Sequence, residues 1–338
     1  MREPKAISLA LQGGGAHGAF TWGVLARLLE EPALKIEGIC GTSAGAMNAA
    51  LLAYGLNTGD QDKTRELLDT YWRKISELAR FSLLQPTPLD KLLSPGNMDC
   101  SPFYQFFDAL SRVASPYQLN PLNRNPLRDL LSDLIDFDRL RQTHGVNLFI
   151  CATNVLTGKI RVFNLPEVSV DVLCASACLP FLFQAVTIDG QPYWDGGYMG
   201  NPPLFPLIYH TPCPDILIIQ VNPISIPKVP TTAQAIADRI NEISFNSSLM
   251  REMRAIHFVS KLIDSGYDHG GRLRRLYIHT IGAEEVTGEL GVSSKLNADW
   301  EFLCYLRKIG YERAEEWIEK HYDRIGKTSS CDIETVFL

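Results

Sequence analysis

Residues 41–46 read Gly-Thr-Ser-Ala-Gly-Ala and place Ser43 between two glycines in the pattern Gly-x-Ser-x-Gly. An apolar run at residues 36–40 precedes this pattern, and good helix formers at residues 47–54 follow it. A strand, a tight turn and a helix in that order are the context in which the pattern indicates a nucleophile elbow. We therefore predict that Ser43 is strained and exposes its hydroxyl for attack on a carbonyl carbon.

The two flanking glycines, Gly41 and Gly45, fit the same prediction. A Cβ atom at either position would collide with the neighbouring strand or helix. The helix that follows would aim its amide end at the serine, with Ala44 contributing a backbone donor where negative charge develops. The alternative is a turn of small residues that only packs a helix on a strand.

A second glycine-rich turn lies earlier in the chain. Residues 6–11 read as a buried strand, and the sequence from Gln12 to Phe20 leads into a helix predicted over residues 22–29. Consecutive bare amides at a helix start form a concave donor site for an oxyanion. This predicts an anion-binding turn that precedes the serine elbow within one βαβ unit.

The same turn also fits a dinucleotide-binding fingerprint. Gly13, Gly15 and Gly18 match G-x-G-x-x-G, and Glu37 is an acid about 20 positions further on. Two features disfavour this interpretation. Glu37 precedes the apolar part of its strand, whereas a ribose-binding acid belongs at the strand's end. A nucleotide fold also has no need of a serine elbow at that end.

A candidate base follows a predicted hairpin. Strand-like residues 186–188 and 191–194 flank a tight Asp-Gly turn, and the second strand delivers Asp195, followed by Gly196 and Gly197. A serine elbow needs a base, and Asp195 is placed to be one. A carboxylate with a pKa of ~3.9 is a poor base unless it is desolvated, and the preceding apolar residues are expected to desolvate it.

The remaining pattern predicts alternating strands and helices, and therefore one α/β domain with a mostly parallel sheet. Helices are expected over residues 60–80, 168–178, 231–263 and 299–322, and strands over residues 147–154, 160–163, 215–222 and 276–281. Residues 81–126 differ because prolines interrupt an apolar stretch. We expect this insertion to be a lid or acyl-chain funnel that also dips into a lipid surface. The alternative is a subdomain that only caps the core.

Composition excludes several classes of protein. The 338 residues are 46% hydrophobic and 21% charged with a net charge of −6, so there is no basic footprint for nucleic acid. No apolar run approaches the roughly 18 residues of a membrane span, and the N-terminal run is too short for a signal peptide. The eight cysteines form no CxxC pair or spaced Cys/His set. We expect a reducing, cytoplasmic setting with no metal and no cofactor.

Taken together, the two glycine turns and the Asp-Gly-Gly segment resemble the patatin-like phospholipase family. Residues 175–180, Ala-Ser-Ala-Cys-Leu-Pro, are similar to a serine-to-proline signature of that family. The order and gaps match over roughly residues 6–222. Residues 116–123 and 241–246 resemble a bacterial branch of the family.

The resemblance implies a three-layer α/β/α fold and hydrolysis of fatty-acyl esters of phospholipids or lysophospholipids. It implies a Ser43–Asp195 dyad without histidine and an oxyanion hole supplied by the backbone at the first glycine turn and the elbow. Oxyanion-hole residues would be Gly13, Gly14, Gly15 and Ala44, with Gly18, Gly41, Gly45, Gly196 and Gly197 supporting them. The whole chain, residues 1–338, would be one acyl hydrolase domain with a core at about 6–222 and a C-terminal extension at about 223–338.

The chain departs from the family pattern at His17, where many relatives carry Arg or Lys. Because histidine is only partly protonated near neutral pH, a fixed positive charge beside the oxyanion site is in doubt.

Two alternative functions stay open. One is an α/β-hydrolase triad, because five histidines follow Asp195 in the order that such a triad requires. These are His210, His257, His269, His279 and His321. The other is a non-enzymatic nucleotide- or lipid-binding protein. Lipid class, sn-position preference and oligomeric state are not set by the sequence.

Overall fold

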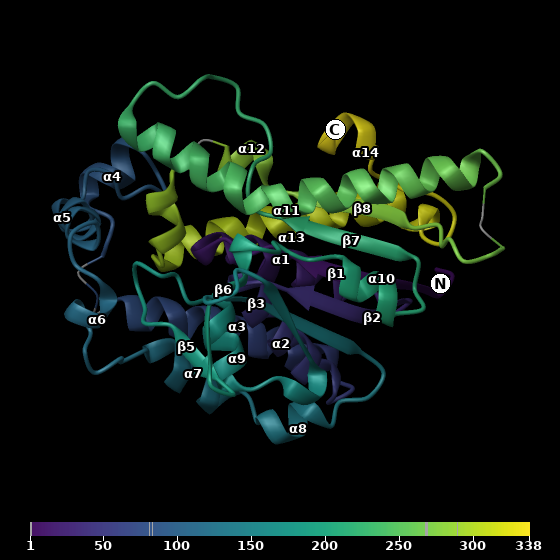
Figure 1. Cartoon of the computed structure of the whole chain (residues 1–338), viewed down its shortest axis with the longest axis horizontal. Coiled ribbons are helices and arrows are strands. Elements are labelled where there is room, and N and C mark those ends of the chain that lie inside the picture. The colour runs from purple at the N-terminus through teal and green to yellow at the C-terminus, as the bar shows by residue number, and fades with distance from the viewer. Residues whose placement is uncertain (1, 81, 83, 268–269, 289) are drawn as a thin grey trace.

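The computed structural model describes residues 2–80, 82, 84–267, 270–288 and 290–338. Within these residues, eight strands form one sheet in the order β5-β6-β3-β2-β1-β7-β8, with β4 paired to β3 (Figure 1). The strands are β1 Lys5–Leu11, β2 Leu34–Gly41, β3 Asn147–Asn154, β4 Ile160–Asn164, β5 Val186–Ile188, β6 Gln191–Asp195, β7 Asp215–Gln220 and β8 Tyr277–Gly282.

The centre of the sheet is parallel, as predicted. β3, β2, β1, β7 and β8 run in one direction, and β4, β5 and β6 add antiparallel pairings at one side. The carboxyl ends of the parallel strands therefore meet at one edge of the sheet, where ligands bind in open α/β folds. The two glycine turns follow β1 and β2, which are adjacent, so both turns lie at that edge.

Helices cover the sheet on both faces, which confirms the three-layer α/β/α fold. They are α1 Gly18–Leu28, α2 Ala44–Leu56, α3 Gln61–Ala79, α4 Pro88–Leu93, α5 Pro102–Ser111, α6 Pro116–Leu119, α7 Pro126–Leu134, α8 Phe137–Arg141, α9 Val170–Ser176, α10 Phe205–His210, α11 Ala233–Asp264, α12 Glu284–Thr287, α13 Trp300–His321 and α14 Ile333–Phe337. Short 3-10 helices are η1 Gly15–His17, η2 Leu165–Glu167, η3 Gly196–Tyr198, η4 Val292–Leu296 and η5 Tyr322–Arg324. Helix α1 begins before residue 22, because η1 runs directly into it.

The two faces of the sheet can be assigned from alternation along the buried strands. In β7, Leu217 and Ile219 belong to the apolar cluster of α1, α2, α3 and α13, whereas Ile216 and Ile218 belong to the cluster of α10, α11 and α14. Parallel strands that are covered on both faces are apolar at every position, which explains the unbroken apolar runs in the sequence. The segment after residue 222 takes part in this core, because β8 extends the sheet and α13 packs on α1.

The proline-rich insertion forms short helices rather than a disordered linker. Prolines stand at the first turns of α4, α5 and α6, where the missing N–H is not needed. Figure 1 shows these three helices together at one end of the molecule. Phe81 and Leu83, which belong to the predicted insertion, lie outside the described residues. Among the described helices, none is long and apolar enough to span a bilayer.

Candidate active site

Ser43 occupies the predicted elbow between β2 and α2. Its backbone has φ 55° and ψ −125°, a conformation that a residue with a side chain rarely adopts and that is costly outside a functional turn. A Cβ at Gly45 would lie 2.2 Å from the Leu11 carbonyl oxygen, and one at Gly41 would lie 2.5 Å from the Gly45 carbonyl oxygen. The strained serine and the two required glycines agree with the sequence prediction.

The first glycine turn packs directly against this elbow. A Cβ at Gly13 would lie 2.7 Å from Ser43 Cβ, and one at Gly18 would lie 2.8 Å from Ala44 Cβ. Gly15 has φ +59°, which favours glycine, and a Cβ there would lie 2.3 Å from the Lys295 carbonyl oxygen. The turn is therefore a backbone surface held between the serine and η4.

Three of the predicted oxyanion donors lie at starts of helices. Gly14 is the N-cap of η1, Gly15 begins η1 and Ala44 begins α2, where N–H groups have no acceptor within their own helix. The Gly13 amide differs because it donates to Asn201 Oδ1 at 2.7 Å. The N–H of Gly13 is therefore not free to bind an oxyanion. Gly13 instead allows the turn to pack closely against Ser43.

Asp195 ends β6 and reaches the same edge of the sheet. It is fully buried, and its Oδ1 accepts a 2.7 Å hydrogen bond from the Gly197 amide. Gly196 is needed because a Cβ there would lie 2.4 Å from the Cys151 carbonyl oxygen. Oδ2 has no hydrogen-bond partner within the described residues. A buried carboxyl oxygen without a partner is costly, which is typical of a functional group.

Burial raises the pKa of Asp195 to about 7, against the opposing effects of the Gly197 amide, the Ser43 side chain and the charge of Lys295. Ser43 and Asp195 line the same cavity, although no hydrogen bond joins the Ser43 hydroxyl to Oδ2. Catalytic hydrogen bonds often tighten only once substrate is bound. This desolvation agrees with the one predicted from the apolar residues that precede Asp195.

A cavity of about 440 Å³ joins these groups. Ser43, Asp195, Gly14 and Gly15 line it together with residues of α5, α11 and η4. Its apolar lining consists of Tyr104, Phe107, Leu179, Phe181, Leu182, Tyr198, Phe245, Val292 and Leu296. The insertion therefore contributes part of the wall through α5, which makes the site an apolar hollow with one polar end.

Three residues that hold the site together were missed by sequence reasoning. Ser176 Oγ accepts from the Ser43 amide at 3.0 Å, and Asn201 donates back to the Gly13 carbonyl at 3.3 Å. Asn222 Nδ2 donates to the same carbonyl at 2.7 Å. Ser176 lies within the recognised 175–180 segment, so that segment could have suggested a role for it. Asn201 follows Gly200 and Asn222 follows a buried strand, and neither lies in a sequence motif that would indicate a role in the site.

His17 does not supply a positive charge to the site. It is buried, and its Nε2 lies 2.7 Å from Ser294 Oγ. Desolvation and the charge of Lys295 lower the pKa of His17 to about 3, so this ring is neutral at physiological pH. A basic side chain is present near the glycine turn on Lys295, which lines the cavity and whose carbonyl oxygen borders Gly15.

The histidines of the triad alternative lie elsewhere wherever the structure describes them. His279 is buried between Asp215 Oδ1 at 3.0 Å and Ser330 Oγ at 2.9 Å, so it orders the C-terminal segment. His257 faces Glu334, and His321 packs on Trp317. His269 lies outside the described residues. Among the described residues that line the Ser43 cavity, none is histidine.

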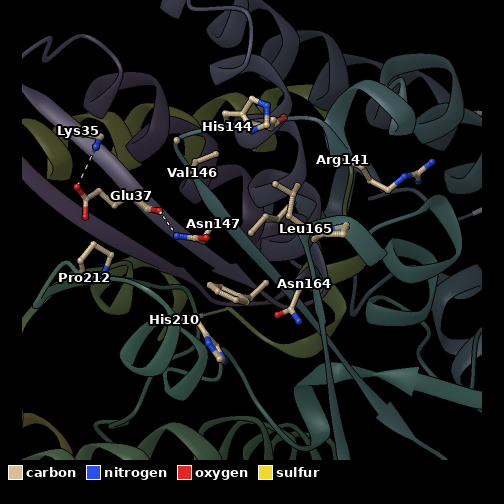
Figure 2. A pocket seen from close by; sticks show the side chains of 15 residues that line it. Lys35, Glu37, Arg141, His144, Val146, Asn147, Asn164, Leu165, His210 and Pro212 are labelled. Atoms are coloured by element: carbon tan, nitrogen blue, oxygen red, sulfur yellow. Dashed lines mark hydrogen bonds and ion pairs between the residues drawn. The ribbon is translucent and has the colours of Figure 1, made fainter. Parts of the chain in front are cut away.

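A larger hollow of about 680 Å³ lies at the opposite ends of the strands (Figure 2). Its lining includes His210, the start of β3 and the pair Lys35–Glu37, whose side chains are 3.2 Å apart. It contains none of the predicted site residues. Glu37 therefore lies away from the glycine turn. A phosphate bound at that turn would leave its ribose out of reach of Glu37, so Glu37 is not placed as a ribose-binding acid.

Residues 9–208 match the family described as patatin-like phospholipase. Because this match covers more than half of the chain, the protein belongs to the patatin-like phospholipase family. The class of protein predicted from the sequence is therefore confirmed.

The chain is also similar to a cGAMP-activated phospholipase of Escherichia coli (strain TW11681), with 27% identity over 228 residues, 60% of this chain and 55% of that protein. It spans about half the length of that relative. Among solved structures, VipD from Legionella pneumophila is similar at 18% identity and a TM-score of 0.47, over 95% of this chain and 67% of that one. ExoU in the ExoU–SpcU complex of Pseudomonas aeruginosa is similar at 22% identity and a TM-score of 0.39, over 95% of this chain and 52% of that one.

Proposed function

We propose that this protein is a serine acyl hydrolase that uses a Ser43–Asp195 dyad to cleave fatty-acyl esters of phospholipids or lysophospholipids. The observation that carries the proposal is the convergence at one cavity of a strained serine and a buried carboxyl. The carboxyl oxygen Oδ2 has no partner in the described structure, and backbone amides at helix starts adjoin the serine. These are the nucleophile, the base and the oxyanion donors of acyl transfer.

In the proposed mechanism Ser43 Oγ attacks the ester carbonyl carbon while its proton passes to Asp195 Oδ2. The amides of Gly14, Gly15 and Ala44 stabilise the tetrahedral oxyanion. Its collapse breaks the ester C–O bond, and the leaving alcohol takes the proton from Asp195. Water then attacks the acyl-enzyme, gives a proton to Asp195, and the second collapse returns that proton to Ser43 as the fatty acid leaves.

Product analysis on defined lipids tests the proposed function. The purified chain is incubated with a phospholipid, a lysophospholipid, an acylglycerol and a short soluble ester, and free fatty acid is measured by mass spectrometry. We expect fatty acid from the glycerol-based lipids, and no release of phosphate or headgroup. Hydrolysis of only the short soluble ester would contradict the phospholipid assignment, and hydrolysis of none would contradict the enzyme assignment. Because the similar E. coli protein is named as cGAMP-activated, the assay is run with and without that nucleotide.

Activity should rise with pH through the neutral range. Asp195 must be deprotonated to accept the serine proton, and its pKa is raised to about 7. Log kcat/KM on a soluble ester is therefore expected to rise with a slope of about 1 below that pH and level off above it. A profile that stays flat from pH 5 to 8 would contradict a base with this pKa.

The cavity opening is expected to contact a lipid surface. Exposed apolar side chains lie on the elements that line the cavity, namely Phe103 and Phe106 on α5, Ile236 and Ile240 on α11, and Phe181, which lines the cavity itself. Exposed apolar side chains of this kind suit insertion into a bilayer interface. We therefore propose that the enzyme works at the surface of a membrane.

Replacing Phe106 with aspartate should lower turnover of phospholipid vesicles about 10-fold, because an exposed aromatic anchor would become a charge. Phe106 is 66% exposed and does not line the cavity, so hydrolysis of a short soluble ester should change little. Tyr209→Asp is the matched control, since Tyr209 is 74% exposed on α10. Equal vesicle activity in both variants would argue against this contact surface.

A further inference from the structure

Lys295 is joined to the glycine turn through both its backbone and its side chain. Its carbonyl oxygen borders Gly15 so closely that a Cβ there would lie 2.3 Å away. Its Nζ donates to Asn222 Oδ1 at 2.8 Å, and Asn222 Nδ2 donates to the Gly13 carbonyl at 2.7 Å. The ammonium group is therefore positioned beside the turn that borders Ser43, and it lines the same cavity.

The charge of this ammonium is not matched by a close carboxylate. Two cations line the cavity in the described part of the chain, and one of them, Arg112, is paired with Asp108 at 3.0 Å. No described carboxylate lies within ion-pair distance of Lys295. Asp238, Glu242 and Asp195 act on it from further away, and desolvation outweighs them and lowers the pKa of Lys295.

A lysine ammonium has three N–H donors, and the bond to Asn222 uses one of them. The partly desolvated ammonium would gain most from an incoming anionic acceptor, because charge-assisted hydrogen bonds are the strong ones and are stronger where water is excluded. Phosphate oxygens provide such acceptors, and lysine binds phosphate as a point charge. In a glycerophospholipid the phosphate and the acyl ester share one glycerol unit, so a phosphate-binding group must lie beside the acyl-transfer site.

We propose that Lys295 binds the phosphate of the substrate and makes the enzyme prefer phosphate-bearing glycerol esters over neutral acylglycerols. This inference rests on the proposed function, since it uses the Ser43 cavity as the acyl site. Asn222 acts as a positioning residue that holds the ammonium beside the glycine turn.

The test compares a lysophospholipid with a monoacylglycerol of the same acyl chain in native enzyme, Lys295→Met and Lys295→Arg. We expect Lys295→Met to lower the ratio of kcat/KM for the two substrates by about 10-fold to 100-fold, the usual effect of losing a charged hydrogen bond. Lys295→Arg should restore most of that preference, because it keeps the charge. Lys308→Met, at an exposed position of α13, is the matched control and should leave the ratio unchanged.

An unchanged ratio of the two kcat/KM values in Lys295→Met would overturn the proposal. If both kcat/KM values fell by the same factor, the charge of Lys295 would act on the oxyanion instead of on the phosphate. In either case Ser43-dependent hydrolysis would persist in the native enzyme, so the dyad would still stand. If Lys295→Met does not fold, inhibition of the native enzyme tests the phosphate site instead. Glycerol 3-phosphate should inhibit monoacylglycerol hydrolysis competitively at concentrations where glycerol does not, and equal inhibition by both would contradict a phosphate site.

Discussion

Replacement of Ser43 with alanine is expected to lower kcat/KM on every ester substrate by at least about 10³-fold. The variant loses the attacking oxygen, and the remaining amides can only stabilise an oxyanion that water would have to generate. Alanine is smaller than serine and keeps the Cβ, so the close packing against Gly13, where an added Cβ would lie 2.7 Å from the Cβ of residue 43, is unaffected. Fatty acid release from a lysophospholipid and hydrolysis of a soluble chromogenic ester are the two measurements.

Ser244→Ala is the matched control for that variant. Ser244 is exposed on α11, and its hydroxyl donates only to the Ile240 carbonyl of the same helix. It should keep native turnover. Native-like hydrolysis by Ser43→Ala would show that the nucleophile lies elsewhere and would remove the basis of the proposed mechanism.

Replacement of Asp195 with asparagine should lower kcat by about 10³-fold to 10⁴-fold, the order seen when the acid of a catalytic triad is neutralised. Asparagine has nearly the same shape, and its Oδ1 can still accept from the Gly197 amide at 2.7 Å. It cannot accept the serine proton as a carboxylate can. The loss should appear in kcat measured over pH 6 to 9, and the rise of activity through pH 7 should disappear.

The same variant should fold at least as well as the native chain at pH 8. Because the folded-state pKa of Asp195 is raised to about 7, its protonated form stabilises the fold at low pH, and that contribution is lost as pH rises through this value. Asparagine stays neutral and avoids the cost of a buried charge. A thermal midpoint well below native, or activity close to native, would contradict this role. Asp189→Asn, in the exposed β5–β6 turn, is the matched control.

The serine elbow and the sheet could be predicted from sequence because local constraints specify them. Gly41 and Gly45 are fixed by collisions within one strand–turn–helix unit, and parallel strands covered on both faces leave unbroken apolar runs. Asp195 was predictable in identity through its hairpin and the two glycines that follow. The approach of its carboxyl to the Ser43 cavity was not predictable. The cytoplasmic setting of the protein stays a prediction.

The rest of the site depends on contacts between segments far apart in the chain. Lys295 approaches Gly15 from 280 positions further along the sequence, and its local segment carries no motif. Likewise, a sequence containing His17 cannot show that this ring is buried and neutral, because burial is set by η4 and α13 packed over it. The place of α5 in the cavity wall also depends on contacts between distant segments, and a lid function for the proline-rich insertion stays a prediction.

Covalent trapping tests the central claim most directly. Native enzyme, Ser43→Ala and Asp195→Asn are incubated with a long-chain alkyl fluorophosphonate, and the adduct is located by intact mass and peptide mapping. We expect one adduct per native chain, on Ser43, formed at a rate that follows the loss of esterase activity. Labelling should be absent in Ser43→Ala and much slower in Asp195→Asn. An adduct on another residue that accompanies inactivation, or equal labelling rates in native enzyme and Asp195→Asn, would contradict the Ser43–Asp195 dyad.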